Sequence, residues 1–235
     1  MSHREEDLVF DPEQFSGRVR LFPLPNLVLF PHVIQPLRVF ERRYVDLLHE
    51  ALAGDRLIAM AHLQPGWEQD YEGRPAIAPV ACLGRVLTWQ AQPNMQYNLL
   101  LVGLCRVRIM CELPPERSFR EAQVELLDDV YRRAGAKRRP SLERKLTAAF
   151  EKMLPRVDEA AELFNEVSAK NISLSTLTDV ISYALDLDVA AKQSLLEELD
   201  VDRRAKLLLQ HFDKTSREPA DEPVAADFPP AFSTN

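Results

Sequence analysis

The sequence predicts an α+β protein in which a β-rich domain with one inserted helix precedes a helical domain. Apolar and polar residues mostly alternate between residues 18 and 128, which is the pattern of half-buried strands. From about residue 140 the apolar residues recur with helical spacing instead. Hydrophobic residues make up 46% of the 235 residues, enough for the core of one large domain or of two small ones.

Alternation is clearest in two segments of the β-rich part, RVRIMCEL (106–113) and REAQVELL (120–127). In the first segment we expect Val107, Ile109 and Cys111 to face the core and Arg106 to face outward. Further strands are expected at 57–63, 80–90 and 97–104. Such short, closely spaced strands are typical of a small barrel or sandwich.

The stretch from Leu21 to Tyr44 is rich in strand-forming residues, yet it contains Pro23, Pro25, Pro31 and Pro36. Because proline lacks a backbone N–H, we expect each of them where a strand bends, crosses or lies at an edge. The inserted helix is expected at 40–53, where apolar residues form a helical stripe that ends before a glycine.

Helical stripes are expected at 142–153, 157–167 and 174–185, followed by two helices capped by Asp188 and Asp200. The basic run YRRAGAKRRP (131–140) has the composition of a connector between the two domains. We therefore divide the chain into a flexible arm (1–17), a β-rich domain (18–130), a helical bundle (131–213) and a disordered, proline-rich acidic tail (214–235).

Composition argues against several classes of protein. The net charge is −7, and neither residues 1–128 nor residues 129–235 are basic, so nucleic acid is a poor candidate partner. The charged N-terminus, the three cysteines and the lack of a long apolar run predict a soluble, cytoplasmic protein without a membrane span. The five histidines are at least 13 residues apart, and we expect neither a metal nor a cofactor.

Three segments, in order along the chain, resemble the Lon protease N-terminal, substrate-binding domain family. The first is LFPLPNLVLFPHVIQPLRVFERRYVDLLHEALAGDRLIAMA (21–61), and the second is GRVLTWQ followed by YNLLLVGLCRVRI. The third, 181–212, matches the pattern KQ.LLE..DV..R...L at Lys192, Gln193, Leu195, Leu196, Glu197, Asp200, Val201, Arg203 and Leu207. The resemblance extends from about residue 19 to residue 212.

This resemblance implies a distorted β-barrel of the PUA-like type with one inserted helix, followed by a helical bundle. It also implies a non-catalytic module that binds unfolded or exposed apolar polypeptide segments, or a specific protein, and that acts as an adaptor in protein quality control. Members of the Lon family continue into ATPase and peptidase modules. No GxxxxGK[ST] loop or G-x-S-x-G elbow occurs in this sequence, so we expect a stand-alone domain that is not an enzyme.

Five residues are candidates for binding a polypeptide. Trp67 and Tyr71 lie in a long loop, 64–79, which is either a lid over the barrel or a binding element. Trp89, Met95 and Tyr97 lie around an expected hairpin tip, where they either contact a partner or pack across the strands.

Three other readings remain open at this point. An RNA-binding PUA-like protein is the main alternative, with Arg132 to Arg139 as the concentrated basic candidate. A hydrolase built on Glu41, Asp46 and Glu50 is a weaker one, because acids spaced by four residues usually lie on a solvated helix face. The segment DFPPAF (227–232) is either a docking motif or part of a disordered end. The oligomeric state is not predicted.

Overall fold

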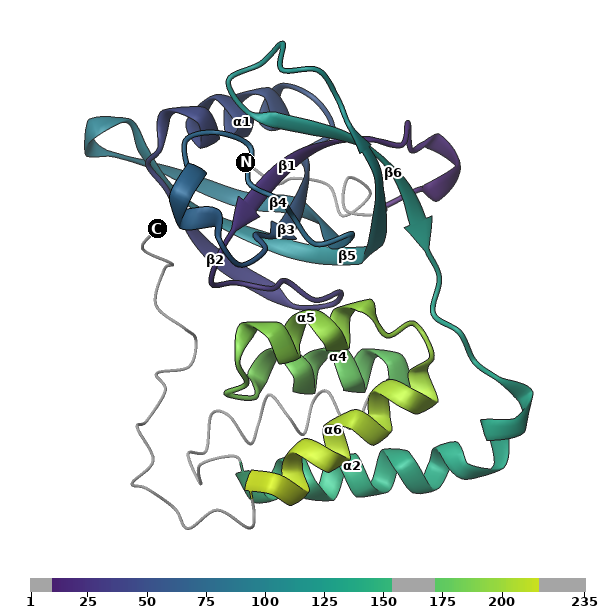
Figure 1. Ribbon diagram of the computed structural model, residues 1–235. Coiled ribbons are helices and arrows are strands. Elements are labelled where there is room, and N and C mark those ends of the chain that lie inside the picture. Colours follow the sequence, from purple (N-terminus) through teal and green to yellow (C-terminus); the bar gives the residue numbers. More distant parts are fainter. Residues whose placement is uncertain (1–9, 154–171, 216–235) are drawn as a thin grey trace. The chain divides into compact units, whose positions relative to one another are not determined.

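A computed structural model describes residues 10–153 and 172–215, and it divides the chain after Leu127 into a barrel unit and a helical unit (Figure 1). The barrel unit contains η2 (Pro12–Gln14), β1 (Arg18–Leu24), β2 (Ile34–Val39), α1 (Arg42–Ala53), β3 (Leu57–His62), η3 (Trp67–Asp70), β4 (Val80–Gln92), η4 (Pro93–Met95), β5 (Gln96–Glu112) and β6 (Arg120–Leu127). The helical unit contains η5 (Arg133–Arg138), α2 (Arg139–Met153), α4 (Leu174–Ala184), α5 (Val189–Glu197) and α6 (Val201–Thr215). The predicted α+β class is confirmed.

Some predictions fall on residues that the structure does not describe. The helical stripe at 157–167 and the DFPPAF segment lie outside the described residues, as do the first nine residues of the predicted arm. The rest of the predicted arm, residues 10–17, is described, and there Phe10 and Phe15 pack against the barrel core.

The strands of the barrel unit pair in a closed ring. β1 pairs in parallel with β3, and antiparallel pairs then connect β3 to β4, β4 to β5, β5 to β6 and β6 back to β1. The remaining strand, β2, pairs only with the first half of β5, at residues 97–102. The ring leaves β2 as an edge strand attached to a closed barrel.

One long strand makes this closure possible. The segments 97–104 and 106–113, expected as separate strands, form the single 17-residue strand β5. Along one edge, β5 pairs with β4 over nearly its whole length. Along the other edge it pairs first with β2 and then, from Arg106, with β6.

Gly103 lies where β5 changes partner from β2 to β6. Its carbonyl accepts a hydrogen bond from the His32 amide, and its own amide donates to the Val33 carbonyl, both at 2.9 Å. A Cβ atom at Gly103 would lie 2.0 Å from the Phe30 carbonyl oxygen. Gly103 also pairs across the strands with Gly84, beside a register shift at which Leu104 of β5 is the extra residue. Glycine is required here because another backbone passes too close for a side chain.

Small residues fill the middle of the barrel. The buried core cluster contains four alanines among larger aliphatic residues: Val19, Leu21, Leu57, Ala59, Ala61, Ala81, Leu83, Val107, Ala122 and Val124. A narrow barrel has room for only a few large side chains, so alternating small and large residues fill it without voids.

Helix α1 covers another part of the barrel unit, beside β1 (Figure 1). Its buried face consists of Tyr44, Val45, Leu47, Leu48 and Ala51, which largely agrees with the predicted stripe. However, Phe40 of the stripe is 39% exposed, and Val45 is buried although the stripe did not include it. The Tyr44 ring lies 4.3 Å from the Phe22 ring, and its hydroxyl donates to the Pro23 carbonyl at 3.1 Å. The helix ends at Gly54, whose amide bonds to the Ala51 carbonyl.

The two prolines that lie within strands occupy positions where a missing N–H does little harm. Pro36 is in the edge strand β2. Pro23 is in β1 beyond Leu21, the last β1 residue paired with β6, so that only β3 pairs with it. This placement agrees with the expectation that strand prolines lie at edges.

Two predictions of side-chain direction in β5 are wrong. Cys111 is exposed rather than buried, because a β-bulge between Ile109 and Cys111 shifts the register with β6. Arg106 is only 2% exposed, although we expected it to face solvent. Arg106 points away from the barrel core, on the same face of the sheet as its cross-strand neighbour Cys82. Because Cys82 is also fully buried, this outer face of the sheet is covered here.

The helical unit is built around α6, which packs against both α2 and α4. Its apolar core is supplied by Leu146, Phe150, Leu174, Leu177, Ile181, Leu185, Leu195, Leu196, Val201, Ala205, Leu208 and Phe212. The predicted caps are confirmed: Asp188 accepts from the Ala191 amide at 2.6 Å, and Asp200 accepts from the Arg203 amide at 3.2 Å. Pro140 lies in the first turn of α2, where proline is tolerated.

A fully buried arginine, Arg204, connects the parts of the helical unit. Its guanidinium donates to Asp129 at 3.0 Å, to the Thr178 hydroxyl at 2.9 Å and to the Glu198 carbonyl at 2.8 Å. The equally buried Asp179 lies 3.6 Å away. These partners come from the start of the unit, from α4 and from the residues before α6, so one cation joins three segments.

We expect Gly103→Ala to destabilise the protein by about 1–3 kcal/mol, because the new methyl group would displace the Phe30 backbone. Thermal and urea unfolding measure this loss. Met110→Ala is the control, since Met110 lies in the same strand and is 59% exposed. Equal stability of the two variants would contradict the close approach at Gly103.

Arg204→Met should lower the free energy of unfolding by about 3–5 kcal/mol, because it leaves Asp179 buried without its cation. The neighbouring Arg203 provides a matched control. Its side chain is 64% exposed and pairs with Glu198, so Arg203→Met should cost less than about 1 kcal/mol. Urea unfolding of both variants tests the difference, and a similar loss in both would refute the role of Arg204.

Candidate functional site

The barrel unit contains a hollow at the place where β1 and β6 separate. The two strands pair up to Leu21 and Arg120, after which β1 continues without β6 beside it. We call this space the seam hollow, and its volume is about 560 Å³. It is lined by Pro23, Glu41, Arg42, Arg43, Tyr44, Leu63, Tyr71, Glu72, Gly73, Arg74, Pro75, Pro115, Arg117, Ser118, Phe119 and Arg120.

Part of the lining of the seam hollow is apolar. Pro23 and Leu63 come from the β1 and β3 ends of the sheet, and Leu63 is 2% exposed. Phe119, which immediately precedes β6, is 4% exposed. Tyr44 adds an aromatic ring whose hydroxyl is already bonded to Pro23. This surface suits an apolar side chain.

Another wall is a cluster that joins the 64–79 loop to the start of α1. The Tyr71 hydroxyl donates to Glu41 at 2.6 Å, and Glu41 also pairs with Arg43 at 2.9 Å. The Arg43 guanidinium lies 4.6 Å from the centre of the Tyr71 ring and donates to the Tyr71 carbonyl. Burial and the bond to Glu41 raise the pKa of Tyr71, which keeps its hydroxyl protonated as a donor.

The arginines on the remaining side of the seam hollow are also bonded. Arg120 is paired with Glu112 and donates to the Pro75 carbonyl at 2.9 Å. Arg74 donates to the Leu113 carbonyl at 3.0 Å. Arg117 is paired with Glu50 at 2.6 Å. Because these charges are already satisfied within the protein, they shape the hollow more than they attract anions.

The structure places Trp67 and Tyr71 together, with their rings 5.4 Å apart in an edge-to-face arrangement. Trp67 is half-buried in η3, and Tyr71 lines the seam hollow. The 64–79 loop is thus folded onto the start of α1 through Tyr71.

Trp89, Met95 and Tyr97 form a second group, around the tip of the β4–β5 hairpin. Met95 is 66% exposed and Trp89 is 40% exposed, with the Arg56 guanidinium 5.5 Å from the centre of the Trp89 ring. Tyr97 is half-buried rather than exposed, because its hydroxyl bonds to His49 of α1 at 2.9 Å. The five candidate residues therefore belong to two places and not to one site.

Sequence reasoning missed the residues that give the seam hollow its shape, above all Arg43, Phe119 and Arg120. The nearest signal was the charged run FERRY at 40–44, which opens α1. Glu41 was considered only as a hydrolytic carboxylate together with Asp46 and Glu50. All three are bonded to arginines in the structure, an arrangement typical of structural ion pairs.

Two properties of the described residues bear on other kinds of site. Within 10–153 and 172–215, no cluster of three or more His, Cys, Asp or Glu side chains has an arrangement that could hold a metal ion. In the same ranges, no helix is long and apolar enough to cross a membrane.

The fold and the sequence agree on the class of protein. Residues 18–214 match the family described as the ATP-dependent protease La (LON) substrate-binding domain. Since this match covers most of the chain, the protein belongs to that family, as the resemblance predicted. The N-terminal domain of a Mycobacterium avium complex Lon protease shares the fold, with a TM-score of 0.67 and 18% identity over 83% of this chain and 98% of that one.

Other relatives carry the same family name. A Lon N-terminal domain protein from Xanthomonas campestris has a TM-score of 0.58 and 22% identity over 82% of this chain and 97% of its own. The Lon protease of Cytophaga hutchinsonii is 27% identical over 89% of this chain, and that of Heliobacterium modesticaldum is 28% identical over 81%. The chain spans 26% and 23% of the length of these two proteases.

We expect Tyr71→Phe to loosen the 64–79 loop, because it removes a charged hydrogen bond of about 1.5–3 kcal/mol. Amide hydrogen exchange should quicken in 67–75 and stay unchanged in the core strands. Tyr97→Phe is the matched control, since it removes only the bond to His49. If amide hydrogen exchange in the 64–79 loop of Tyr71→Phe were unchanged, the bond to Glu41 would not be what holds this loop in place.

Proposed function

We propose that this chain is a non-catalytic recognition domain that binds unfolded or exposed apolar segments of polypeptides. The observation that carries the proposal is the seam hollow, an opening with a partly apolar lining in a domain of the Lon substrate-binding family. Its volume of about 560 Å³ is within the range of small ligand sites. It has room for one or two apolar side chains of an extended segment.

Binding in the seam hollow depends on side-chain burial rather than on strand addition. The free edge of β1 beyond Leu21 offers few backbone groups, because Pro23 has no N–H and its carbonyl is bonded to Tyr44. The other edge strand, β2, contains Pro36. Prolines on edges discourage pairing with another chain. An incoming segment therefore gains more by placing apolar groups against the accessible apolar part of the lining, such as Pro75 and Pro115.

The β4–β5 hairpin tip supplies a second contact area in this proposal. Met95 is an adaptable apolar side chain that is largely open to solvent, and Trp89 offers a broad aromatic surface. Shallow apolar contacts of this kind accept many sequences, which is what a binder of unfolded chains requires. The chemistry that follows binding belongs to another protein or domain, so we assign this chain an adaptor role in protein quality control.

The test measures, by fluorescence anisotropy, how tightly the full chain binds a labelled protein that has been reduced and alkylated so that it cannot fold. Trp89→Ser combined with Met95→Ser should weaken binding about tenfold, since each residue is a large exposed contact. Ser118→Trp narrows the seam hollow from its rim, so this variant should weaken binding to a similar degree. Met110→Ser removes an exposed methionine elsewhere and should leave binding unchanged.

Circular dichroism and urea unfolding establish that the variants are folded. Failure of the intact protein to bind any unfolded chain would overturn the proposal. Binding that is unchanged in both the tip variant and the rim variant would refute the assigned surfaces, since the apolar contact would then lie elsewhere.

A further inference from the structure

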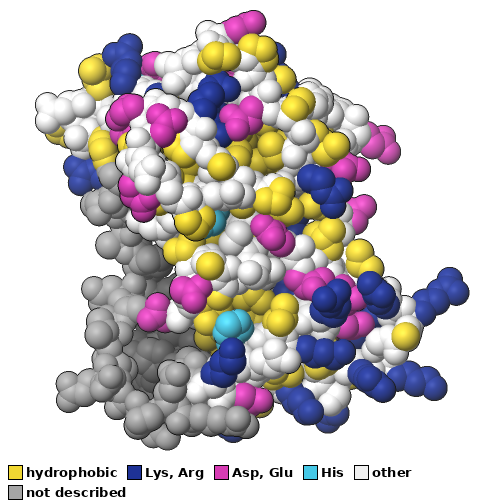
Figure 2. All heavy atoms as spheres, viewed as in Figure 1, with side chains coloured by type: hydrophobic (Ala, Val, Ile, Leu, Met, Phe, Trp, Pro, Cys, Tyr) yellow, Lys and Arg dark blue, Asp and Glu magenta, His cyan; other side chains and the backbone are white. Residues whose placement is uncertain are grey.

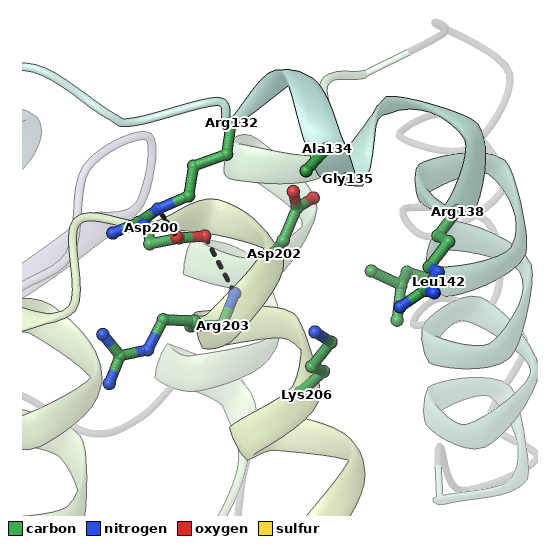
Figure 3. A pocket seen from close by; sticks show the side chains of 9 residues that line it. All are labelled: Arg132, Ala134, Gly135, Arg138, Leu142, Asp200, Asp202, Arg203 and Lys206. Carbon is green, nitrogen blue, oxygen red and sulfur yellow. Dashed lines mark hydrogen bonds and ion pairs between the residues drawn. The ribbon is translucent and has the colours of Figure 1, made fainter.

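The helical unit contains a second hollow, which we call the cationic pocket, between the η5–α2 segment and the start of α6 (Figure 3). Its volume is about 300 Å³. It is lined by Arg132, Ala134, Gly135, Arg138, Leu142, Asp200, Asp202, Arg203 and Lys206. The basic run 131–140, expected to be a connector, therefore forms one wall of a pocket.

Internal ion pairs build the frame of the cationic pocket. Arg132 pairs with Asp200 at 2.6 Å, and Arg139 pairs with Asp202 at 2.8 Å. Gly135 lies so close to Asp202 that a Cβ atom would be 1.8 Å from its carboxylate oxygen. These contacts hold η5 against the first turn of α6, so the position of the pocket wall does not depend on a ligand.

Several cations around the pocket remain without a carboxylate partner. Arg138 and Lys206 line it, and Arg133 and Lys137 lie in the same η5 turn; all four are exposed. Within the described residues, none of the four makes an ion pair. Figure 2 shows Lys and Arg side chains gathered at this end of the helical unit, although the whole chain has a net charge of −7. Such a local excess attracts a negatively charged partner.

The lining favours an acidic polypeptide over a nucleic acid. Leu142 and Ala134 give the pocket an apolar patch that an aliphatic side chain can cover. Asp200 and Asp202, already paired with Arg132 and Arg139, separate the remaining cations, so the pocket lacks the continuous cationic track that a nucleic-acid backbone requires. The Arg139 guanidinium lies 5.0 Å from the centre of the nearby Tyr131 ring and occupies one of its faces, so this 43% exposed ring offers a base one face only.

We propose that the cationic pocket is a docking surface for an acidic polypeptide segment in which aliphatic residues separate Asp or Glu residues. Carboxylates of the segment pair with Arg138 and Lys206, while an aliphatic side chain covers Leu142. This surface is independent of the seam hollow, and it selects by charge rather than by the unfolded state of the partner.

The test is fluorescence anisotropy of the full chain with a labelled peptide of alternating Glu and Leu, at low and at physiological salt. Arg138→Glu combined with Lys206→Glu should reduce affinity at least about tenfold and flatten its dependence on salt. Lys145→Glu combined with Lys152→Glu changes the net charge of the chain equally, on exposed positions of α2 outside the pocket. This control should change affinity less than about threefold.

Three outcomes would overturn the proposal: no binding of the peptide, equal losses in the pocket and control variants, or tighter binding of a single-stranded oligouridine that the pocket variant abolishes. The last outcome would assign the pocket to RNA instead. Binding of an unfolded apolar protein should persist in the pocket variant, which separates this surface from the function proposed for the barrel unit.

Discussion

The architecture of the barrel unit depends on the close passage of two backbones at Gly103. There β5 exchanges one partner strand for another, and the Phe30 carbonyl occupies the space that a Cβ atom would need. Because β2 leaves the edge of β5 at this point, β6 can take its place and complete the ring through β1. Across the strands, Gly84 lies beside a register shift and is itself crowded, because a Cβ atom there would lie 2.8 Å from the Leu101 side chain.

The same topology produces the seam hollow. β6 begins at Arg120, which pairs with Leu21, so the antiparallel strand β1 continues beyond the start of β6 and its end lacks a neighbour on that side. The separation leaves no backbone N–H at Pro23 without a partner, because proline has none, and the Pro23 carbonyl accepts a hydrogen bond from the Tyr44 hydroxyl. The opening that we propose as a recognition site is therefore a consequence of how the barrel closes, and the 64–79 loop borders it through its contact with Glu41.

The helical unit is organised by buried charge. Arg204 connects Asp129, α4 and the turn before α6, while Arg132 and Arg139 connect η5 to the first residues of α6. Replacing such pairs by apolar residues is often neutral for stability, so their value here lies in fixing which segments meet. Because Asp200 and Asp202 are used in these internal pairs, Arg138 of η5 and Lys206 of α6 are left exposed to solvent, and both line the cationic pocket.

The sequence alone determined the class of the fold, the order of its elements, the caps at Asp188 and Asp200 and the family, because these follow from local periodicity and from residue types at fixed spacing. It did not determine the seam hollow, the exposure of Cys111 or the burial of Arg106. These depend on strand register, on a bulge and on contacts between residues far apart in the chain. No local pattern encodes such contacts, so only the tertiary structure decided where the candidate residues lie and which of them share a site.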